Sequence, residues 1–554
     1  MARVVNSRLR LLLFVILVTF AALGARTAWI QTVRSSSLAA LAQEQTKANL
    51  VLPAQRGTIF DRLGTPLAIG EQATDVIADP KQIADPGQEA KVAAKVLRLP
   101  RGQVYRALAD RKLGFVYVER KALPKRASAL AKRDLTGFTF EADERRVYPQ
   151  GTVAAPVLGY AGTDDTGLAG LELGLNKQLS GTPGRATVVR DATGQTVNTI
   201  QDRPARDGRD VFLTLDSHIQ ANAEQVLENA VHEWHAKDAT AIVLDPRTGA
   251  VLAMAQEPGY NANDYPTASA HEQIEHAVTD VYEPGSVFKV VTIGGALSQH
   301  DITPNTEFRV PGTLHVADRV IHDAEQHGTE MLKVRQILQR SSNIGTDIIA
   351  GRYLGESGLK KWMHRFGIGR RTGIDFPGES AGLLPSWSGS TIGTVPIGQG
   401  VSVTAIQLAS IYSAIANGGE WIQPHLVDHV LGEPPPRLHR RRMLDPDVDG
   451  QLRTMLRGVV SDQGTAELAA IPGYAVAGKT GTAQKPGPNG YIPGAYVSTF
   501  VGMVPASRPR LVVLVTIDEP HGSIYGGIVA APAFEQIASF DLQYLAVPPD
   551  RRIG

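Results

Sequence analysis

The hydrophobic pattern of the chain begins with one continuous apolar run and then changes to strand-like and helical patterns. Residues 11–25 are all apolar or small. Residues 58–60 favour a strand, and the turn-forming residues at 61–64 predict that the chain then folds back as a hairpin. Residues 88–112 have a helical period that is interrupted at Pro100, which predicts two short surface helices. A folded region is therefore expected after the apolar run.

A second folded region is predicted beyond a change of texture at residues 202–208. Residues 219–234 have the pattern of an amphipathic helix, and residues 240–255 read as two strands joined by a Pro/Gly turn. Residues 287–297 are apolar enough for a buried helix that begins at or next to Ser286. The second region therefore mixes strands with helices.

The first apolar run predicts a membrane anchor. Three arginines and no acidic residue precede it, so the positive-inside rule places residues 1–10 in the cytoplasm and the rest of the chain outside. A helix needs about 20 residues to cross a bilayer, and residues 11–30 reach that length by including Trp29. A cleaved signal peptide, with residues 22–24 as a small-x-small cleavage site, is the alternative.

Ser286 and Lys289 form the first candidate catalytic pair. Residues three apart on a helix share a face, so the Lys289 amine is expected beside the Ser286 hydroxyl. A nearly buried and partly deprotonated lysine can take the proton of a serine nucleophile. The same spacing also fits a serine helix cap followed by a surface lysine, and this segment by itself leaves both interpretations open.

Ser341 and Asn343 form a second candidate site. They lie on a predicted tight connection between helical stretches at 331–339 and 346–353, where both side chains could point into a cleft. Serine and asparagine are also ordinary loop and capping residues. Their interpretation as site residues therefore depends on Ser286 and the lysine beside it.

The K-T-G-T segment at residues 479–482 is the third candidate and follows a strand-like stretch at 474–477. Gly481 would let another backbone approach, and an exposed strand edge can hold an extended peptide by main-chain hydrogen bonds. Residues 473–480 also fit the Walker A pattern of nucleotide-binding loops. That motif requires a helix after its loop, and two prolines and two glycines at 483–490 disfavour one.

Composition narrows the functional classes without naming a partner. Of the 554 residues, 43% are hydrophobic and 20% are charged, as in packed globular proteins. The 56 Lys and Arg nearly cancel the 55 Asp and Glu, so no overall field indicates a nucleic acid partner. There is no cysteine, which excludes disulfides and thiolate ligands, and none of the 14 histidines has metal-ligand spacing. We therefore expect no metal, no cofactor and no nucleic acid.

Several long motifs recur in the order known from one protein family. The pattern R-G-x-I-x-D-R-x-G-x-x-L-A fills residues 56–68, and further motifs follow at 145–149, 167–172 and 179–184. With them the chain resembles the class B penicillin-binding proteins, the monofunctional transpeptidases of bacterial cell-wall synthesis. The resemblance covers nearly the whole chain. It includes the active-site motifs S-x-x-K (Ser286, Lys289), S-x-N (Ser341, Asn343) and K-T-G (Lys479, Thr480, Gly481).

The resemblance implies an α+β fold. A β-lactamase/penicillin-binding transpeptidase-like domain, an antiparallel sheet flanked by helices, is expected at 206–554. A β-rich, non-catalytic pedestal of the penicillin-binding protein dimerisation type is expected at 31–205, after a single N-terminal transmembrane helix. Glu172 begins an E-x-x-L-N sequence like that of the deacylating glutamate of class A β-lactamases. There the motif follows the nucleophile, but here it precedes Ser286, so we interpret it as part of the pedestal.

The resemblance also implies a role for each candidate residue. Lys289 would deprotonate Ser286, which would attack the penultimate D-alanine of a peptidoglycan stem peptide and expel the terminal D-alanine. Ser341 would pass the proton to the leaving amine, and Asn343 would orient the stem amide. Lys479, Thr480 and Thr482 would bind the terminal carboxylate, along the strand that contains Gly481. The backbone N–H groups of Ser286 and Thr482 would form the oxyanion hole.

The implied partners follow from this chemistry. A second stem peptide would supply the acceptor amine, and β-lactams would inhibit covalently. No glycosyltransferase domain fits before residue 205, so a membrane glycan polymerase and other division or elongation proteins are expected partners. The family-like connecting motifs, at 366–369, 397–403, 417–419, 464–466 and 530–532, are closer to the division branch. The predicted location is the bacterial cell (inner) membrane, single-pass, with an extracytoplasmic catalytic domain. A D-alanyl-D-alanine carboxypeptidase, a β-lactamase or a non-catalytic scaffold remain alternatives.

Overall fold

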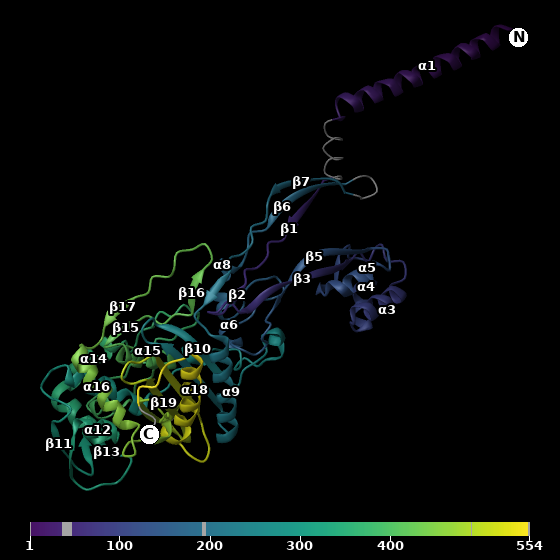
Figure 1. The fold of residues 1–554 in the computed structure, drawn as a ribbon. Helices are drawn as coiled ribbons and strands as arrows, with labels where there is room; N and C mark the ends of the chain where they lie inside the picture. The colour runs from purple at the N-terminus through teal and green to yellow at the C-terminus, as the bar shows by residue number, and fades with distance from the viewer. Residues whose placement is uncertain (1, 36–46, 191–195, 489, 552–554) are drawn as a thin grey trace. The chain divides into compact units, whose positions relative to one another are not determined.

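The protein forms two compact units in this computed structural model (Figure 1). The structure describes residues 2–35, 47–190, 196–488 and 490–551. The first unit consists of Met1–Gln55 and Gly181–Gly208, and the second of Arg56–Ser180 and Arg209–Gly554.

The first unit contains the N-terminal helix and a small sheet. Helix α1 (Ala2–Thr32) includes the whole predicted apolar run, and its segment Asn6–Thr32 is long and apolar enough to cross a membrane. The apolar side chains of this segment are exposed, so no protein core accounts for their hydrophobicity. The sheet is antiparallel in the order β1-β6-β7, with β1 (Lys47–Leu52), β6 (Gly184–Arg190) and β7 (Thr196–Arg203).

A six-stranded mixed sheet opens the second unit. Its order is β16-β8-β2-β3-β4, and β5 also pairs with β3. The predicted hairpin is confirmed, because Ile59 of β2 pairs antiparallel with Ala68 of β3. Strand β2 also pairs in parallel with β8. Strands β6 and β7 of the first unit lie between β2 and β8 in the sequence. The strands are β2 (Ile59–Phe60), β3 (Pro66–Ala78), β4 (Val116–Ala122), β5 (Phe138–Val147), β8 (Val211–Leu213) and β16 (Val427–Val430).

Three short helices share a small hydrophobic core with this sheet. The core joins Val76 and Val118 of the strands to Leu97, Leu108 and Leu130 of the helices. The predicted break at Pro100 is confirmed, since one helix ends before the proline and the next begins after it. The helices are α3 (Pro86–Leu97), α4 (Arg101–Ala109) and α5 (Pro124–Ala131).

Glu172 lies in a buried ion cluster of the pedestal, as its interpretation as a structural residue requires. Its two carboxylate oxygens contact Arg56 at 2.5 Å and Arg146 at 2.6 Å, and all three side chains are at most 3% exposed. Arg56 also donates to Asn176 Oδ1 and to the carbonyl oxygen of Asp165. The cluster therefore ties the first pedestal motif to the later ones and uses the glutamate for structure.

We expect Glu172→Gln to destabilise the protein by about 3–5 kcal/mol, because two buried guanidinium groups would lose the carboxylate that pairs with both of them. Chemical unfolding of the full chain measures this loss. Glu71→Gln is the matched control, since Glu71 pairs with Arg145 on the surface, where both side chains are more than 40% exposed, and a surface pair contributes only about 0–1 kcal/mol. Equal losses in both variants would contradict the structural role of the cluster.

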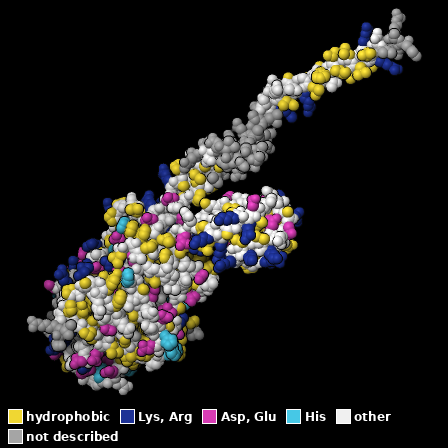
Figure 2. Space-filling model, turned by 45° about the vertical axis from the view of Figure 1, so that its right-hand side comes forward, with side chains coloured by type: hydrophobic (Ala, Val, Ile, Leu, Met, Phe, Trp, Pro, Cys, Tyr) yellow, Lys and Arg dark blue, Asp and Glu magenta, His cyan; other side chains and the backbone are white. Residues whose placement is uncertain are grey.

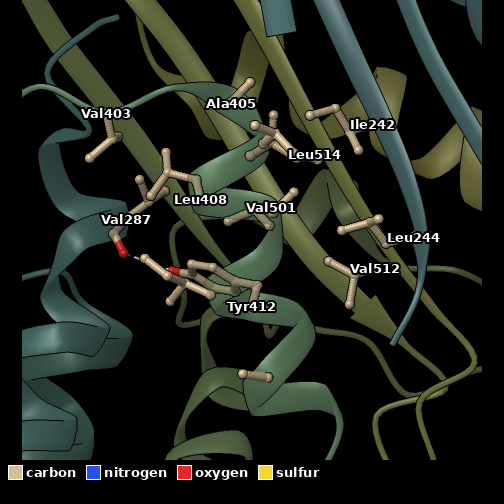
Figure 3. Close-up of a cluster of buried hydrophobic side chains, with 14 of the residues drawn as sticks. Ile242, Leu244, Val287, Val403, Ala405, Leu408, Tyr412, Val501, Val512 and Leu514 are labelled. Carbon is tan, nitrogen blue, oxygen red and sulfur yellow. Dashed lines mark hydrogen bonds between the residues drawn. The ribbon is translucent and has the colours of Figure 1, made fainter. Parts of the chain in front are cut away.

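A five-stranded antiparallel sheet, in the order β10-β9-β20-β19-β18, forms the centre of residues 209–554, the part that the resemblance predicts to be catalytic. Successive side chains of a strand point to opposite faces, so Ile242 and Leu244 enter the core that contains α11 and α15 (Figure 3), whereas Ala241 and Val243 enter the core that contains α9 and α18. The predicted α+β fold is thereby confirmed. The elements are α9 (Ser217–Trp234), β9 (Asp238–Asp245), β10 (Ala250–Glu257), α11 (Lys289–Leu297), α15 (Ala405–Ala416), β18 (Ala477–Gly487), β19 (Gly490–Val504), β20 (Leu511–Asp518) and α18 (Ala531–Tyr544).

The remaining elements are short and surround these sheets. Before the catalytic sheet they are α6 (Ala155–Leu158), α7 (Gly170–Gly174) and α8 (Asn176–Leu179). Between β10 and β18 they are η1 (Ala262–Thr267), α10 (His276–Thr279), η2 (Gly285–Phe288), β11 (Glu307–Val310), β12 (Leu314–Val316), β13 (Arg319–Ile321), β14 (Glu330–Lys333), α12 (Val334–Gln339), α13 (Asn343–Ile349), η3 (Ala350–Leu354), α14 (Gly355–Phe366), η4 (Thr391–Gly393), η5 (Val395–Ile397), β15 (Glu420–Ile422), β17 (Arg440–Arg442), α16 (Pro446–Val459) and η6 (Glu467–Ala469). Helix α17 (Gly526–Val529) precedes α18.

Two predicted boundaries are wrong. The stretch 331–339 begins as strand β14, because residues 330–333 pair with β11, and only α12 is helical. The strand predicted at 474–477 begins only at Ala477 and continues through the K-T-G-T segment as β18. In both places pairing with a distant strand decides the structure, and the local pattern does not contain that information.

Candidate active site

Ser286 lies within the short 3₁₀ helix η2, which leads directly into α11. Gly285 before it has φ +55, a left-handed conformation that favours glycine, and its N–H donates to the carbonyl of Gly398 at 3.1 Å. Tyr412 of α15 is fully buried and donates its hydroxyl to the carbonyl of Val287 at 2.9 Å (Figure 3). The turn that presents Ser286 is therefore held on both sides by buried contacts.

Lys289 begins α11 and is completely buried. Its amine donates to the carbonyl oxygen of Ser341 at 2.5 Å and to Oδ1 of Asn343 at 2.8 Å. Burial lowers the pKa of Lys289 to about 7, against the opposing effect of two carboxylates, Asp323 and Asp347. The ammonium form can donate all three hydrogen bonds that Lys289 makes here, including one to the Ser341 hydroxyl, whereas the neutral amine has two N–H donors and a lone pair that can accept a proton.

Ser341 joins two buried amines. Its hydroxyl oxygen lies 3.1 Å from Nζ of Lys289 and 2.9 Å from Nζ of Lys479. Its backbone has φ +59, a strained conformation for a residue other than glycine. Ser342 next to it caps α13 by accepting a hydrogen bond from the N–H of Gly345. The S-x-N segment is thus a strained turn at the start of a capped helix, as the predicted tight connection required.

Lys479 and its neighbours lie on β18, the edge strand of the catalytic sheet. Burial and the nearby Lys289 amine lower the pKa of Lys479. A Cβ atom on Gly481 would come within 3.0 Å of the carbonyl oxygen of Pro284, so the predicted close approach of two backbones is confirmed. The K-T-G-T strand therefore runs directly against the turn that contains Ser286.

Thr480 and Thr482 alternate with Lys479 and Gly481 along β18, but the long Lys479 side chain still brings its Nζ to 3.3 Å from the Thr480 hydroxyl. The Thr480 hydroxyl contacts the hydroxyl of Thr465 at 2.8 Å, and Thr482 Oγ1 accepts from the N–H of Gly526 at 3.2 Å. Because Lys479 lies inside a strand that continues to Gly487, the helix required after a nucleotide-binding loop is not formed there. The Walker A interpretation is thereby excluded.

Hydrogen bonds connect Lys289, Ser341, Asn343 and Lys479 into one network, as the three motifs together predicted. Ser286 lies one 3₁₀ turn from Lys289, a spacing at which side chains stand on the same side. The cap interpretation of S-x-x-K does not fit, because the lysine is buried and not at the surface.

Asp323 is a residue of this region that the sequence did not indicate. Its carboxylate accepts hydrogen bonds from Ser342 Oγ at 2.6 Å and from the N–H groups of Asn343 and Ile344 at 2.5 and 2.9 Å, and it contacts His327 at 3.0 Å. The aspartate lies 20 residues before the helix that it caps, so no local motif reveals it. It fixes the backbone that carries Ser341 and Asn343.

Thr465 and Asp347 were also missed. Thr465 contacts the second residue of K-T-G, and it lies in a segment noted only for its family resemblance. Asp347 lies one helical turn after Asn343, and its buried carboxyl has no hydrogen-bond partner among the described residues. Burial raises its pKa to about 8. Neither residue stands out in the sequence, because threonine and aspartate are common and their partners are distant.

We expect Asp323→Asn to shift the pH dependence of penicillin acylation toward lower pH. The Asp323 carboxylate favours the ammonium form of Lys289. Replacing it by a neutral amide therefore lowers the pKa of Lys289 further, and the reactive neutral amine persists to lower pH. Asp347 and Lys479, the other titratable groups that face this amine, are present in both proteins. Acylation rates measured from pH 5 to 9 test the shift.

Glu330→Gln is the matched control for Asp323→Asn. Glu330, the first residue of β14, contacts His327 and Arg340 and is not among the groups that shift the pKa of Lys289 in the described structure. The low-pH side of the acylation profile should therefore be the same in Glu330→Gln as in the wild type. A slower rate in Asp323→Asn with an unshifted pH profile would reduce Asp323 to a purely structural residue.

A serine on a helical turn, beside two buried lysines and an edge strand, defines the class of active-serine acyltransferases. A comparison with family models places this chain more narrowly. Residues 239–539 match the penicillin binding protein transpeptidase domain, and residues 51–213 match the penicillin-binding protein dimerisation domain. The chain belongs to the class B penicillin-binding proteins.

Similar proteins extend over nearly the whole chain. The probable peptidoglycan D,D-transpeptidase PenA of Neisseria meningitidis is 33% identical over 99% of this chain and 94% of its own length. The peptidoglycan D,D-transpeptidase FtsI of Escherichia coli is 32% identical, with the same coverage of 99% and 94%. Penicillin binding protein 3 of Mycobacterium tuberculosis, solved with ampicillin, has a TM-score of 0.72 and 31% identity over 91% of this chain and 98% of that structure.

Proposed function

We propose that this protein is a peptidoglycan D,D-transpeptidase that crosslinks stem peptides through an acyl-serine intermediate and is inhibited covalently by β-lactams. The observation that carries the proposal is the position of the Ser341 hydroxyl between the buried amines of Lys289 and Lys479, beside the turn of Ser286. The names of the relatives support the activity, and the ampicillin complex of a relative supports the inhibition.

Acylation begins with proton transfer from Ser286 to the neutral amine of Lys289. The serine oxygen attacks the carbonyl carbon of the penultimate D-alanine, and the backbone N–H groups of Ser286 and Thr482 hold the developing oxyanion. The bond to the terminal D-alanine then breaks. Its amine takes the proton from Lys289 through the hydroxyl of Ser341, which leaves the lysine neutral again and the donor peptide esterified to the serine.

The donor peptide is held along β18. Its terminal carboxylate meets the amine of Lys479 and the hydroxyls of Thr480 and Thr482, and the negative charge favours the ammonium form of Lys479 that burial opposes. Asn343 already donates one N–H to the carbonyl of His322. Its second N–H is the group that orients the stem amide, while Gly481 leaves room for the backbone of Pro284.

An amine of a second stem peptide resolves the ester and forms the crosslink. A carboxypeptidase or a β-lactamase would use water instead, and the deacylating glutamate of class A β-lactamases has no counterpart in the E-x-x-L-N sequence of this chain, because Glu172 is occupied by Arg56 and Arg146. This position of Glu172 argues against the hydrolytic mechanism of class A β-lactamases for the second step.

A competition between water and an amine tests the proposed function. The purified full chain is given a thioester analogue of the donor stem, with and without a D-amino acid as acceptor, and the products are identified by mass spectrometry. The proposal expects an aminolysis product that increases with acceptor concentration at the expense of the hydrolysed acid. Hydrolysis that the acceptor does not reduce would identify a carboxypeptidase.

Helix α1 supports a single-pass anchor in the bacterial cell (inner) membrane, with the amino terminus in the cytoplasm and the catalytic part outside. We place the enzyme beside a membrane glycan polymerase, because crosslinking requires newly polymerised glycan strands as its substrate. A role at the division septum rests on the connecting motifs. Depletion followed by imaging of septa tests it, and loss of rod shape with normal septa would favour elongation.

A further inference from the structure

One part of the pedestal concentrates positive charge. Residues 79–134, here called the basic lobe, contain fourteen Lys and Arg against six Asp and Glu, an excess of eight positive charges in a chain whose net charge is only +1. The rest of the chain therefore carries a net charge of −7. Figure 2 shows Lys and Arg side chains gathered on the lobe that projects from the main body of the second unit.

Most of these cations are not neutralised within the protein. Arg120 pairs with Asp164, and Lys121 pairs with Asp165, at the base of the lobe. In the described part of the chain, eight exposed cations in and around α3 and α4 form no ion pair: Lys81, Lys91, Lys95, Arg98, Arg101, Arg106, Arg111 and Lys112. Their field is thus available to an external anion.

The turn between α4 and β4 adds an apolar tip to this charged surface. Leu113, Phe115 and Tyr117 are 45%, 53% and 45% exposed. The tip is ordered, because Leu113 N–H donates to the carbonyl of Asp110 at 3.1 Å and Arg111 donates to the carbonyl of Ile83 at 3.2 Å. The turn therefore holds its large apolar side chains in water instead of folding them into the small core beneath.

We propose that the basic lobe is a second membrane contact, which seats its apolar tip among the headgroups of an anionic bilayer. Aromatic residues favour the membrane interface, and clustered Lys and Arg are attracted to anionic lipid. The chain itself carries a helix suited to that bilayer, so such a surface is its constant neighbour. Unpaired cations around a small apolar tip match lipid headgroups better than a protein partner, whose interface core is depleted of charge.

The absence of cysteine permits a direct test. Leu113→Cys in the full chain accepts a single environment-sensitive fluorophore, and Leu431→Cys, at a residue 57% exposed in the catalytic part, is the matched control site. Each labelled protein is reconstituted through α1 into nanodiscs of phosphatidylcholine alone or mixed equally with phosphatidylglycerol. Quenching by doxyl-labelled lipid then reports contact with the bilayer.

The proposal expects quenching at position 113 in the anionic discs and little at position 431. The double variant Arg111→Glu, Lys112→Glu should reduce the quenching at position 113 roughly fivefold or more for each charge reversed. High salt should also reduce this quenching. Equal signals at both positions, or a label at 113 that stays in water in both lipids, would overturn the proposal. A label that is shielded only when other wall-synthesis proteins are added would assign the tip to a protein partner.

Discussion

Ser286→Ala should lose the covalent penicillin adduct completely. The hydroxyl is the atom that would form the ester, because Ser286 stands on the turn that runs against the K-T-G strand and directly precedes the helix of the buried Lys289. Intact-mass analysis of the purified full chain after exposure to benzylpenicillin should show the mass of one added penicillin in the wild type and none in the variant. The thermal unfolding of both proteins should agree closely, since the half-buried serine side chain is small.

Ser298→Ala is the matched control for this loss. Ser298 follows the same helix, and its hydroxyl donates to the carbonyl of Gly294 at 2.7 Å. Its removal should leave the adduct intact. An adduct that survives in Ser286→Ala would move the nucleophile to another residue and would remove the basis of the proposed mechanism.

Lys289→Met should slow penicillin acylation by ~10²-fold or more, the usual scale for the loss of a general base. Methionine keeps the length and the apolar stem of the side chain but cannot take the serine proton. The buried acceptors on Ser341 and Asn343 would also lose their donor, at a cost of about 1–3 kcal/mol each. Unfolding must therefore be measured beside the rate, to show that the variant is still folded under assay conditions.

Lys479→Met separates binding from chemistry. Its amine faces the place proposed for the ligand carboxylate, so this variant should weaken the noncovalent affinity for penicillin as well as the acylation rate, whereas Lys289→Met should lower the rate with the affinity largely kept. Stopped-flow acylation over a range of penicillin concentrations resolves both quantities. Near-normal acylation in Lys289→Met would reject Lys289 as the base.

The acid limb of the wild-type rate gives an independent check on that base. The neutral amine is the reactive form, and the pKa of Lys289 is lowered to about 7, so the rate should rise with pH through the neutral range and then level off. In an unburied lysine the same rise would occur several units higher.

The residues of the candidate site were easier to single out from the sequence than the residues that support them. Ser286, Lys289 and Lys479 were recognisable because their chemistry depends on short spacings within one turn or one strand. Their junction at the Ser341 hydroxyl could be expected only from the family, since Lys289 and Lys479 lie 52 and 138 residues from that serine. Distances of this kind follow from tertiary packing, which no local pattern contains.

Supporting residues were missed for the same physical reason. Tyr412 reads as one apolar position of a buried helix, and only the fold brings its hydroxyl to the carbonyl beside Ser286. Asp323 reads as an ordinary loop aspartate, although it accepts two backbone N–H groups of a helix 20 residues later. Strand β14 was mistaken for a helix because its partner β11 lies outside the window in which a period can be read.

The mixed sheet of the second unit also determines how the protein unfolds. Strand β2 of the pedestal supplies the parallel neighbour of β8, which in turn pairs with β16 deep in the catalytic sequence. A chain cut near residue 205 would leave β8 with one open edge, and such edges invite association with other copies. Pedestal and catalytic part should therefore melt in a single cooperative transition, and strain applied to one should be transmitted to the other through these main-chain bonds.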